Sequence, residues 1–122
     1  MNAIPWIKEL LWIKEKVQLH SKKEFNCVLL NFYRSGEDHI SWHSDNESEL
    51  GENPIIASIS LGETRKFRVR NKKDKKLIFS FELENGSLLL MKGKTQTYWE
   101  HEISKNKKSV SERINLTFRL II

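Results

Sequence analysis

The amino-acid sequence predicts a mainly β domain, either an antiparallel sandwich or a jelly roll, with one α-helix at its N-terminus. Apolar residues recur at helical spacing near the start of the chain. Beyond Phe25 the apolar period becomes two, and turn signals divide the chain into short segments. The length of 122 residues suffices for one domain and its core, but not for two. We therefore expect residues 1–122 to form a single domain.

The predicted helix begins at Pro5. Proline suits the first position of a helix, because its fixed φ is already helical and no N–H is needed there. An apolar stripe follows at spacings of four, three and four, and it consists of Trp6, Leu10, Ile13 and Val17. This spacing places one apolar face along three to four turns. The polar segment 20–23 ends the helix.

The first predicted strand runs from Phe25 to Tyr33. Successive side chains of a strand point to opposite faces. One face of this strand carries Cys27, Leu29, Asn31 and Tyr33, and the other carries Val28, Leu30 and Phe32. The first face therefore ends in two polar side chains. Cys27 alternates with core residues, so we expect it to pack in the core rather than take part in redox chemistry.

The remaining strands are predicted as short segments that bring the total to about seven or eight. They cover residues 39–42, 54–61, 65–70, 77–83, 87–91, 96–103 and 113–122. The segments on either side of the basic loop are expected to form a hairpin. Gly62-Glu63-Thr64 is a turn, and Asn85-Gly86 is a strong tight-turn signal.

The composition excludes several classes of protein. Cys27 is the only cysteine, so an internal disulfide and a multi-thiolate zinc site are excluded and a reducing compartment is expected. No apolar run approaches the ~20 residues of a transmembrane helix, and the N-terminus lacks the pattern of a signal peptide. We expect an intracellular protein without membrane association, located in the cytoplasm or nucleoid, or in the nucleus.

Charge is unevenly distributed along the chain, although its net value is only +5. Residues 65–76 hold eight cations and one anion, so the rest of the chain is slightly negative. Residues 37–52 contain six acids and neither lysine nor arginine. Such segregation indicates a positive face that could meet a polyanion. A solvated hairpin tip explains the basic segment equally well.

Two histidines and one aspartate form the strongest chemical signal. His43 and Asp45 are two residues apart, so their side chains leave the same face of an extended segment, and His101 could join them from a distant strand. Two imidazoles and one carboxylate are the ligands of non-haem Fe(II) oxygenases, with open positions for substrate and oxygen. Alone, such a triplet is usually a surface feature. His39 competes as a ligand but lies in a polar loop.

The final predicted strand carries a second signal. One face holds Arg113, Asn115, Thr117 and Arg119, and the other holds Ile114, Leu116, Phe118 and Leu120. A polar face in water is the ordinary interpretation. A polar pocket that also includes Asn31 and Tyr33 is the alternative, in which buried arginines need an anion such as a dicarboxylate. The two arginines lie roughly 20 Å apart along an ideal strand, so both would have to lean inward.

In this order, the motifs resemble the core of the AlkB-type Fe(II)/2-oxoglutarate-dependent dioxygenases, in their nucleic-acid alkylation repair branch. The motifs that carry the resemblance are residues 31–34, 42–47, 54–62 and 86–91, Thr95-Gln96, Trp99 with His101, and residues 113–119. They span about residues 25–120. The resemblance implies a double-stranded β-helix, which is a jelly roll, with the N-terminal helix packed on it.

The resemblance also implies a role for each candidate residue. The metal ligands for Fe(II) would be His43, Asp45 and His101. Arg113, helped by Tyr33 and Asn115, would bind the distal carboxylate of 2-oxoglutarate, and Arg119, with Asn31, would hold the end near the metal. Glu47 matches an acidic residue that reads the exocyclic amine of the damaged base, whereas Asn46 replaces an acid often found there. Arg65 matches a position with a substrate-side role.

The implied chemistry is oxidative demethylation of N-alkylated bases, such as 1-methyladenine or 3-methylcytosine, in DNA or RNA. Fe(II), O2 and 2-oxoglutarate would hydroxylate the N-methyl group, which then leaves as formaldehyde. A damaged base must leave the stack before it can react. The basic segment 65–76 would contact phosphates, so binding should weaken with salt. We expect the protein to act as a monomer.

One departure from the family pattern leaves other interpretations open. Family domains carry a longer region before the strand at Phe25, including a lid over the base, whereas here only 24 residues precede it. The expected domain is therefore N-terminally minimal. The alternatives are a 2-oxoglutarate oxygenase that acts on a protein or small molecule, and a truncated, non-catalytic core that binds metal or nucleic acid. Release of succinate would separate the last of these from both enzymes.

Overall fold

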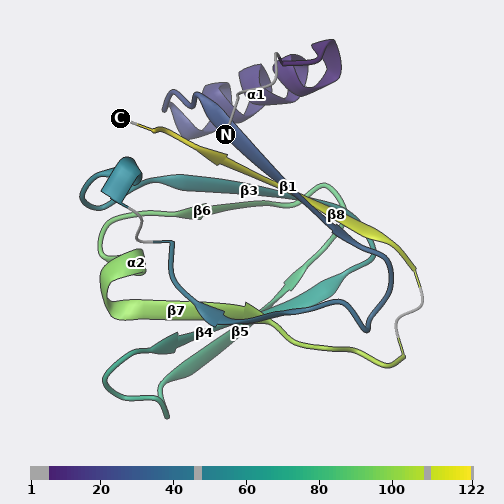
Figure 1. Cartoon of the computed structure of the whole chain (residues 1–122), viewed down its shortest axis with the longest axis vertical. Helices are drawn as coiled ribbons and strands as arrows, with labels where there is room; N and C mark the ends of the chain where they lie inside the picture. Colours follow the sequence, from purple (N-terminus) through teal and green to yellow (C-terminus); the bar gives the residue numbers. More distant parts are fainter. Residues whose placement is uncertain (1–5, 46–47, 109–110, 122) are drawn as a thin grey trace.

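The computed structural model describes residues 6–45, 48–108 and 111–121. Two four-stranded sheets face each other, and helix α1 (Lys8–Ser21) lies on the outside of one of them (Figure 1). All strand pairs in these residues are antiparallel. The predicted class, a mainly β double-stranded β-helix with an N-terminal helix, is confirmed. No helix in the described ranges is long and apolar enough to cross a membrane.

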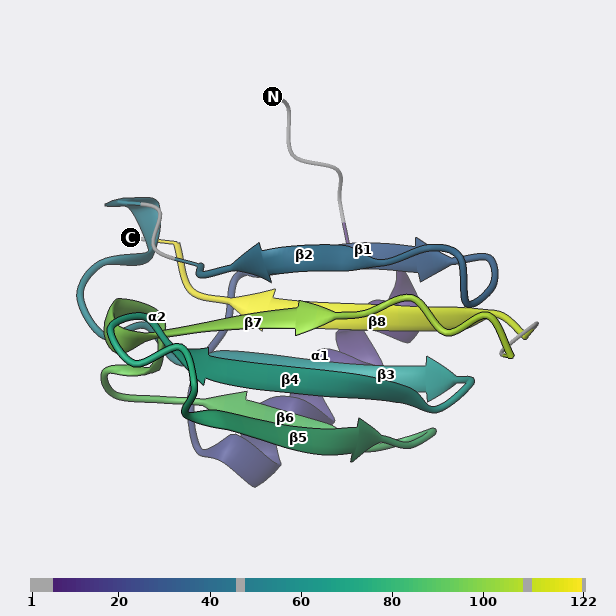
Figure 2. The ribbon, with the colours of Figure 1, turned by 90° about the horizontal axis from the view of Figure 1, so that it is seen from below.

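Apart from the β4–β5 hairpin, successive strands alternate between the two sheets in the manner of a jelly roll. The first sheet has the order β1 (Cys27–Tyr33), β8 (Arg113–Arg119), β3 (Ile56–Gly62) and β6 (Leu88–Met91). The second has the order β2 (Ile40–His43), β7 (Trp99–Ile103), β4 (Arg65–Asn71) and β5 (Ile78–Leu83). Figure 2 looks through the two sheets, so that each strand of one overlaps the corresponding strand of the other. The inner faces of β8 and β7 therefore face each other across the middle.

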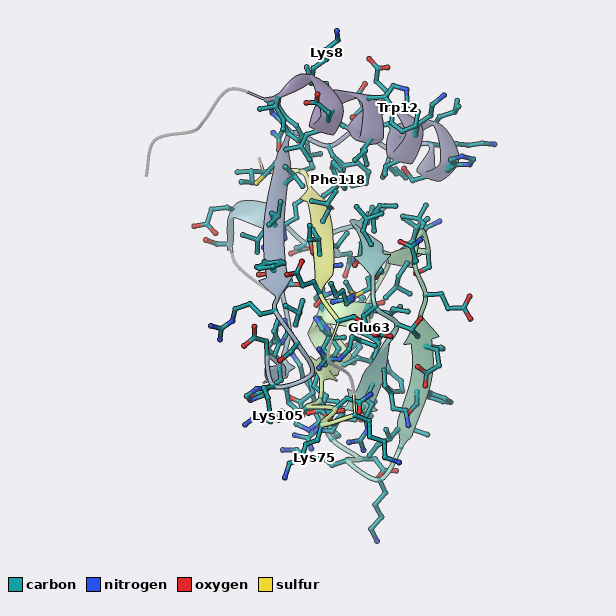
Figure 3. All side chains as sticks on the ribbon, turned by 90° about the vertical axis from the view of Figure 1, so that its right-hand side faces the viewer. Lys8, Trp12, Glu63, Lys75, Lys105 and Phe118 are labelled. Atoms are coloured by element: carbon teal, nitrogen blue, oxygen red, sulfur yellow. The ribbon has the colours of Figure 1, made fainter. Side chains whose placement is uncertain are left out.

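Helix α1 covers the outer face of the first sheet with the predicted apolar stripe. Val17 is buried, and Trp6, Leu10 and Ile13 pack on the same cluster, which includes Phe118 of β8. Trp6 stacks on Phe118 with ring centroids 6.4 Å apart, and Figure 3 shows Phe118 on the side of β8 that faces the helix. Packing of this apolar face, rather than helix propensity, holds a short helix in place. Pro5 lies outside the described residues.

Strand β8 is central to the first sheet and assembles a polar patch on its inner face. Its register places Asn115 opposite Asn31 on one side and opposite Ser60 on the other. Thr117 lies opposite Ser58, and Tyr33 opposite Arg113. The predicted faces of β8 are confirmed, because Leu116 and Phe118 join the apolar cluster under α1. The polar side chains consequently converge between the two sheets.

One local prediction needs correction. The prediction of a strand over residues 96–98 is wrong, because they belong to helix α2 (Thr95–Tyr98), and β7 starts only at Trp99. Tertiary contacts override the β propensity of this segment, because the side chain of Gln96 is buried and bonded inside the fold. The turn at Asn85-Gly86 is present, with Gly86 at φ 82°. It does not close a hairpin, since β5 and β6 lie in different sheets.

Candidate metal and carboxylate site

A cavity of about 250 Å³ lies between the two sheets and contains the predicted site. Its lining includes all three predicted metal ligands: His43, Asp45 and His101. It also includes all five side chains predicted to bind the cosubstrate: Asn31, Tyr33, Arg113, Asn115 and Arg119. Residues that lie far apart in the sequence meet here because β1 and β8 form one wall and β2 and β7 form the other.

The three predicted metal ligands converge at one end of this cavity. Each offers one ligand atom within 4.8 Å of the others. His43 and His101 are directly opposite in the β2–β7 register, and their ring centroids are 4.3 Å apart. Nε2 of His101 lies 3.7 Å from Oδ2 of Asp45. Two imidazoles and one carboxylate are the ligand set of the facial triad in non-haem iron sites.

The protonation of both imidazoles fits a metal site. Nδ1 of His43 lies 2.9 Å from the carbonyl oxygen of Ser41. Since a carbonyl can only accept, this contact selects the neutral tautomer with its proton on Nδ1, which leaves Nε2 as the atom that can bind a metal. Burial, together with the neighbouring His43 and Arg119, lowers the pKa of His101 to about 3. His101 is therefore neutral at pH 7, which is the form that binds a metal.

Asp45 is held by contacts from two other elements. Its Oδ1 accepts a hydrogen bond of 3.1 Å from Arg119 of β8, and its backbone N–H donates 2.8 Å to Oε1 of Gln96 in α2. Next to it, the hydroxyl of Ser44 donates 2.7 Å to the carbonyl of Trp99. Such contacts orient a carboxylate before an ion arrives. The supporting role of Gln96 was not predicted, because nothing local in the sequence links it to Asp45.

The other end of the cavity holds a buried cation with open donors. Arg113 is 2% exposed, and its Nη2 donates 2.9 Å to the hydroxyl of Ser60. Its guanidinium carbon lies 4.9 Å from the centroid of the Tyr33 ring. Among the described residues, Nε and Nη1 have no hydrogen-bond partner. Burial lowers the pKa of Arg113 and raises that of Tyr33. Unpaired N–H groups on a buried cation suit a carboxylate ligand.

A hydroxyl and amide network joins the two ends. Asn115 donates 2.6 Å to the hydroxyl of Ser58 and 3.1 Å to the carbonyl of Ile59, and it accepts 2.8 Å from Thr117. Ser58 and Ser60 were not predicted as site residues. Their spacing of two within the apolar strand β3 is the signal that could have identified them, because it places both on one face.

Arg113 and Arg119 are far apart along β8, but both side chains can serve one ligand because they reach opposite ends of the same cavity. Arg119 reaches the metal end, where it contacts Asp45, and Arg113 reaches the opposite end, where it contacts Ser60. Both side chains line the same cavity. A molecule with a carboxylate at each end therefore has a cation at each end of the space that would receive it.

The predicted substrate residues lie outside this cavity or outside the described residues. Arg65 is 1% exposed, and its guanidinium donates to the carbonyls of Ser35, Asp38 and Ser104. These bonds tie the loop after β1 to the end of β7. Its substrate-side role stays a prediction. Glu47, like Asn46, lies outside the described residues. His39 is not among the three clustered ligands.

The basic segment 65–76 presents a smaller positive surface than its sequence indicates. Arg68 pairs with Glu102 at 2.9 Å, and Arg70 pairs with Glu100 at 2.6 Å. Arg65 is occupied as described above, and Lys72 donates 3.0 Å to the carbonyl of Gln96. The four exposed cations are Lys66, Lys73, Lys75 and Lys76. Three of them surround the hairpin tip, at the end of the molecule far from α1 (Figure 3).

Comparison with known proteins gives a consistent family. Residues 2–119 match the model of the 2OG-Fe(II) oxygenase superfamily. Over 124 residues the chain is 38% identical to alpha-ketoglutarate-dependent dioxygenase alkB homolog 3 of Mus musculus, covering 95% of this chain and 43% of that protein. Over 129 residues it is 39% identical to DNA oxidative demethylase ALKBH2 of Homo sapiens, covering 100% of this chain and 49% of that protein. The chain thus spans about half the length of these curated relatives.

A solved structure supports the fold independently. The structure of OsALKBH1 superimposes with a TM-score of 0.67 and 24% sequence identity, covering 94% of this chain and 66% of that one. At this identity the likeness concerns the arrangement of the strands, which agrees with the two facing sheets described above.

Proposed function

The chain belongs to the AlkB family of 2OG-Fe(II) oxygenases, and from this membership we propose that it oxidatively demethylates N-alkylated bases in DNA or RNA. The bases would be of the 1-methyladenine and 3-methylcytosine type. The observation that carries the proposal is one cavity with three clustered metal ligands at one end and a partly unpaired buried arginine at the other. We propose that residues 1–122 act as one catalytic domain and as a monomer.

The donor sets fit Fe(II) and 2-oxoglutarate. His43, Asp45 and His101 would hold the iron on one side, which leaves positions for other ligands. Bound there, Fe(II) and 2-oxoglutarate would supply an O2-dependent oxidation, in which 2-oxoglutarate becomes succinate and carbon dioxide and the N-methyl group is hydroxylated and lost as formaldehyde. The protein supplies orientation and a site shielded from water.

The chain's own residues divide this work. Arg113, with Tyr33 beside it, would bind the distal carboxylate through its two open N–H groups. Arg119 would hold Asp45 in place and, with Asn31, receive the other end of the cosubstrate. Phe67 stacks on the His101 ring with centroids 5.2 Å apart and shields that ligand from water. Asn115 would keep the wall between the two ends fixed through its bonds to Ser58 and Thr117.

Nucleic acid as the substrate class is supported by the relatives and by the surface. One relative is named a DNA oxidative demethylase. Lys73, Lys75 and Lys76 are exposed at the tip of the β4–β5 hairpin, where they could contact phosphates. We propose that Glu47 reads the exocyclic amine of the flipped base and that Arg65 acts on the substrate side through the loop it holds.

A second candidate is a 2-oxoglutarate oxygenase that acts on a protein or small molecule. The specific observation in its favour is that Arg65, Arg68 and Arg70 are engaged by the chain's own carbonyls and carboxylates. These three cations are therefore less available to phosphates than the sequence indicates.

The proposal is tested by mass spectrometry of a short single-stranded oligonucleotide that carries 1-methyladenine or 3-methylcytosine. The oligonucleotide is incubated with the protein, Fe(II), 2-oxoglutarate and ascorbate, beside an Asp45→Ala control. Loss of one methyl mass with the wild type alone supports demethylation. Succinate without loss of the methyl mass favours the second candidate, and absence of both products indicates a non-catalytic core.

A further inference from the structure

The outer face of the second sheet carries an aromatic and ionic cluster directly behind the metal end. Trp42 of β2 lies with its ring centroid 4.1 Å from the guanidinium carbon of Arg70 and 5.4 Å from that of Arg68. Both arginines belong to β4, which is separated from β2 by β7. We call Trp42, Arg68, Arg70, Glu100 and Glu102 the outer-face cluster.

The two guanidinium groups are fixed by carboxylates of the intervening strand. Arg68 and Glu102 are direct partners in the β4–β7 register, as are Arg70 and Glu100, and their ion pairs measure 2.9 and 2.6 Å. All four side chains are partly buried, so solvent screens these pairs less than fully exposed ones. The arginine planes thus form a preformed platform for an aromatic ring.

The backbone pairing of strand β2 fixes its register only weakly, so side-chain contacts such as those of Trp42 are needed to hold it in place. It has four residues, lies at the edge of its sheet and, among the described strands, pairs with β7 alone. The register shifts between its two paired positions, Ile40 and His43. A short, irregular edge strand can slip, and a slip of one residue turns every side chain to the other face.

Trp42 and His43 are adjacent in this strand, so they point to opposite faces. A fixed outward position of Trp42 therefore fixes the inward position of His43. We propose that Trp42, held by Arg68 and Arg70, is a positioning residue for the metal ligand His43. This inference rests on the proposed metal site and assigns to the outer-face cluster a role in metal affinity rather than in binding phosphates.

The test measures the affinity of the protein for Co(II), through the visible absorption of the bound ion, together with the unfolding temperature of the metal-free protein. Trp42→Ala should raise the Kd for Co(II) by about 10- to 100-fold, as removal of a side chain that supports a ligand does in metal sites. Trp42→Phe keeps a ring for the arginines to stack on and should stay within about threefold of wild type.

Two further variants separate positioning from general stability. Arg70→Lys keeps a positive charge opposite Glu100 but removes the planar group that stacks on Trp42, so it should also weaken Co(II) binding. Lys66→Gln is the matched control, because Lys66 lies on the same face of β4 but opposite Glu82 of β5. It should leave Co(II) affinity and the absorption spectrum unchanged.

Each outcome decides one question. If the wild type binds Co(II) and both Trp42→Ala and Arg70→Lys bind it equally well, this inference is wrong and the proposed site stands. An equal loss in Lys66→Gln also overturns the inference. If Trp42→Ala does not fold, Arg70→Lys decides. Failure of the wild type to bind Co(II) contradicts the proposed metal site itself.

Discussion

The two ends of the central cavity differ in how completely the chain satisfies their polar groups. At the metal end, the proton of His43 is bonded to Ser41, and Asp45 is bonded to Arg119 and Gln96. At the carboxylate end, Arg113 is bonded to Ser60 but has two buried N–H groups without partners in the described residues. The polar groups at the metal end are therefore arranged in advance, whereas Arg113 keeps buried donors that only the proposed ligand would satisfy.

This difference has an energetic consequence. At the metal end, neighbouring hydrogen bonds orient the ligand atoms toward the cavity, and this costs the fold little stability. A buried cation with open donors destabilises the empty fold, because its lost hydration is not replaced. Substitutions at the metal end should therefore abolish metal binding and destabilise the fold. A substitution of Arg113 should weaken binding of 2-oxoglutarate but stabilise the metal-free fold.

The largest effect is expected when the metal end is broken with Asp45→Ala. Metal binding should fall below detection, and formation of succinate should drop by about a thousandfold or more, since a metal contributes several kcal/mol to its reaction. The metal-free protein should also unfold at a lower temperature, because Arg119 loses the carboxylate of Asp45. Co(II) absorption, succinate assays and thermal unfolding measure these effects. Asp74→Ala, at the hairpin tip, is the control and should leave Co(II) absorption and succinate formation unchanged.

The second prediction concerns Arg113, where a substitution should raise the stability of the metal-free protein instead of lowering it. Arg113→Met should weaken binding of 2-oxoglutarate by about 30- to 1000-fold, since loss of a buried charge partner costs about 2–4 kcal/mol. The metal-free protein should unfold a few degrees higher, because an apolar side chain replaces an incompletely paired charge. Calorimetry and thermal unfolding provide both values. Arg34→Met, which removes an exposed ion pair with Asp38, serves as the control. A drop in unfolding temperature for Arg113→Met would contradict the comparison.

A smaller effect is expected from Gln96→Met, which removes the acceptor for the Asp45 N–H. Affinity for Co(II) should fall by about tenfold, and the free energy of unfolding should fall by about 1–2 kcal/mol. Gln18 offers a matched control, because its side chain accepts an equivalent 2.8 Å bond from the N–H of Phe25, far from the cavity. Gln18→Met should lower stability to a similar extent without changing metal affinity. Equal Co(II) affinities in the two variants would remove Gln96 from the site.

The smallest effect concerns the surface outside the cavity. Changing Lys73, Lys75 and Lys76 together to Gln should reduce the salt dependence of binding to a single-stranded oligonucleotide, by about 0.7 in the log–log slope for each phosphate that is no longer neutralised. A triple change of Lys8, Lys16 and Lys23 removes the same charge from α1 and the loop after it, at the other end of the molecule, and should have no such effect. Equal slopes in the two triple variants would favour the second candidate function.

Local alternation predicts the strands and most of the cavity. The period of two along β8 places Arg113 and Arg119 on one face and Phe118 on the other, and both assignments are confirmed. The stripe that includes Val17 likewise predicts the buried face of α1. These faces follow from the residue spacing within one strand or one helix, so the local sequence is enough to predict them.

Features that depend on contacts between distant elements could not be predicted in this way. The short helix at Gln96 forms because its side chain bonds to Asp45, which is 51 residues away. Arg68 and Arg70 look like free cations in the sequence, but β7 supplies their carboxylates. Asn85-Gly86 signals a turn correctly, whereas the sheet that each flanking strand joins is decided by packing elsewhere.

The feature on which the proposed function depends is one cavity with three clustered metal ligands at one end and Arg113 at the other. Calorimetric titration of 2-oxoglutarate into the Mn(II)-loaded protein tests it most directly, with metal-free wild type and Mn(II)-loaded Arg113→Met measured alongside. We expect one molecule bound per chain, with binding much weaker without metal and much weaker in Arg113→Met. Equal affinity in all three samples would contradict a cavity with these two ends.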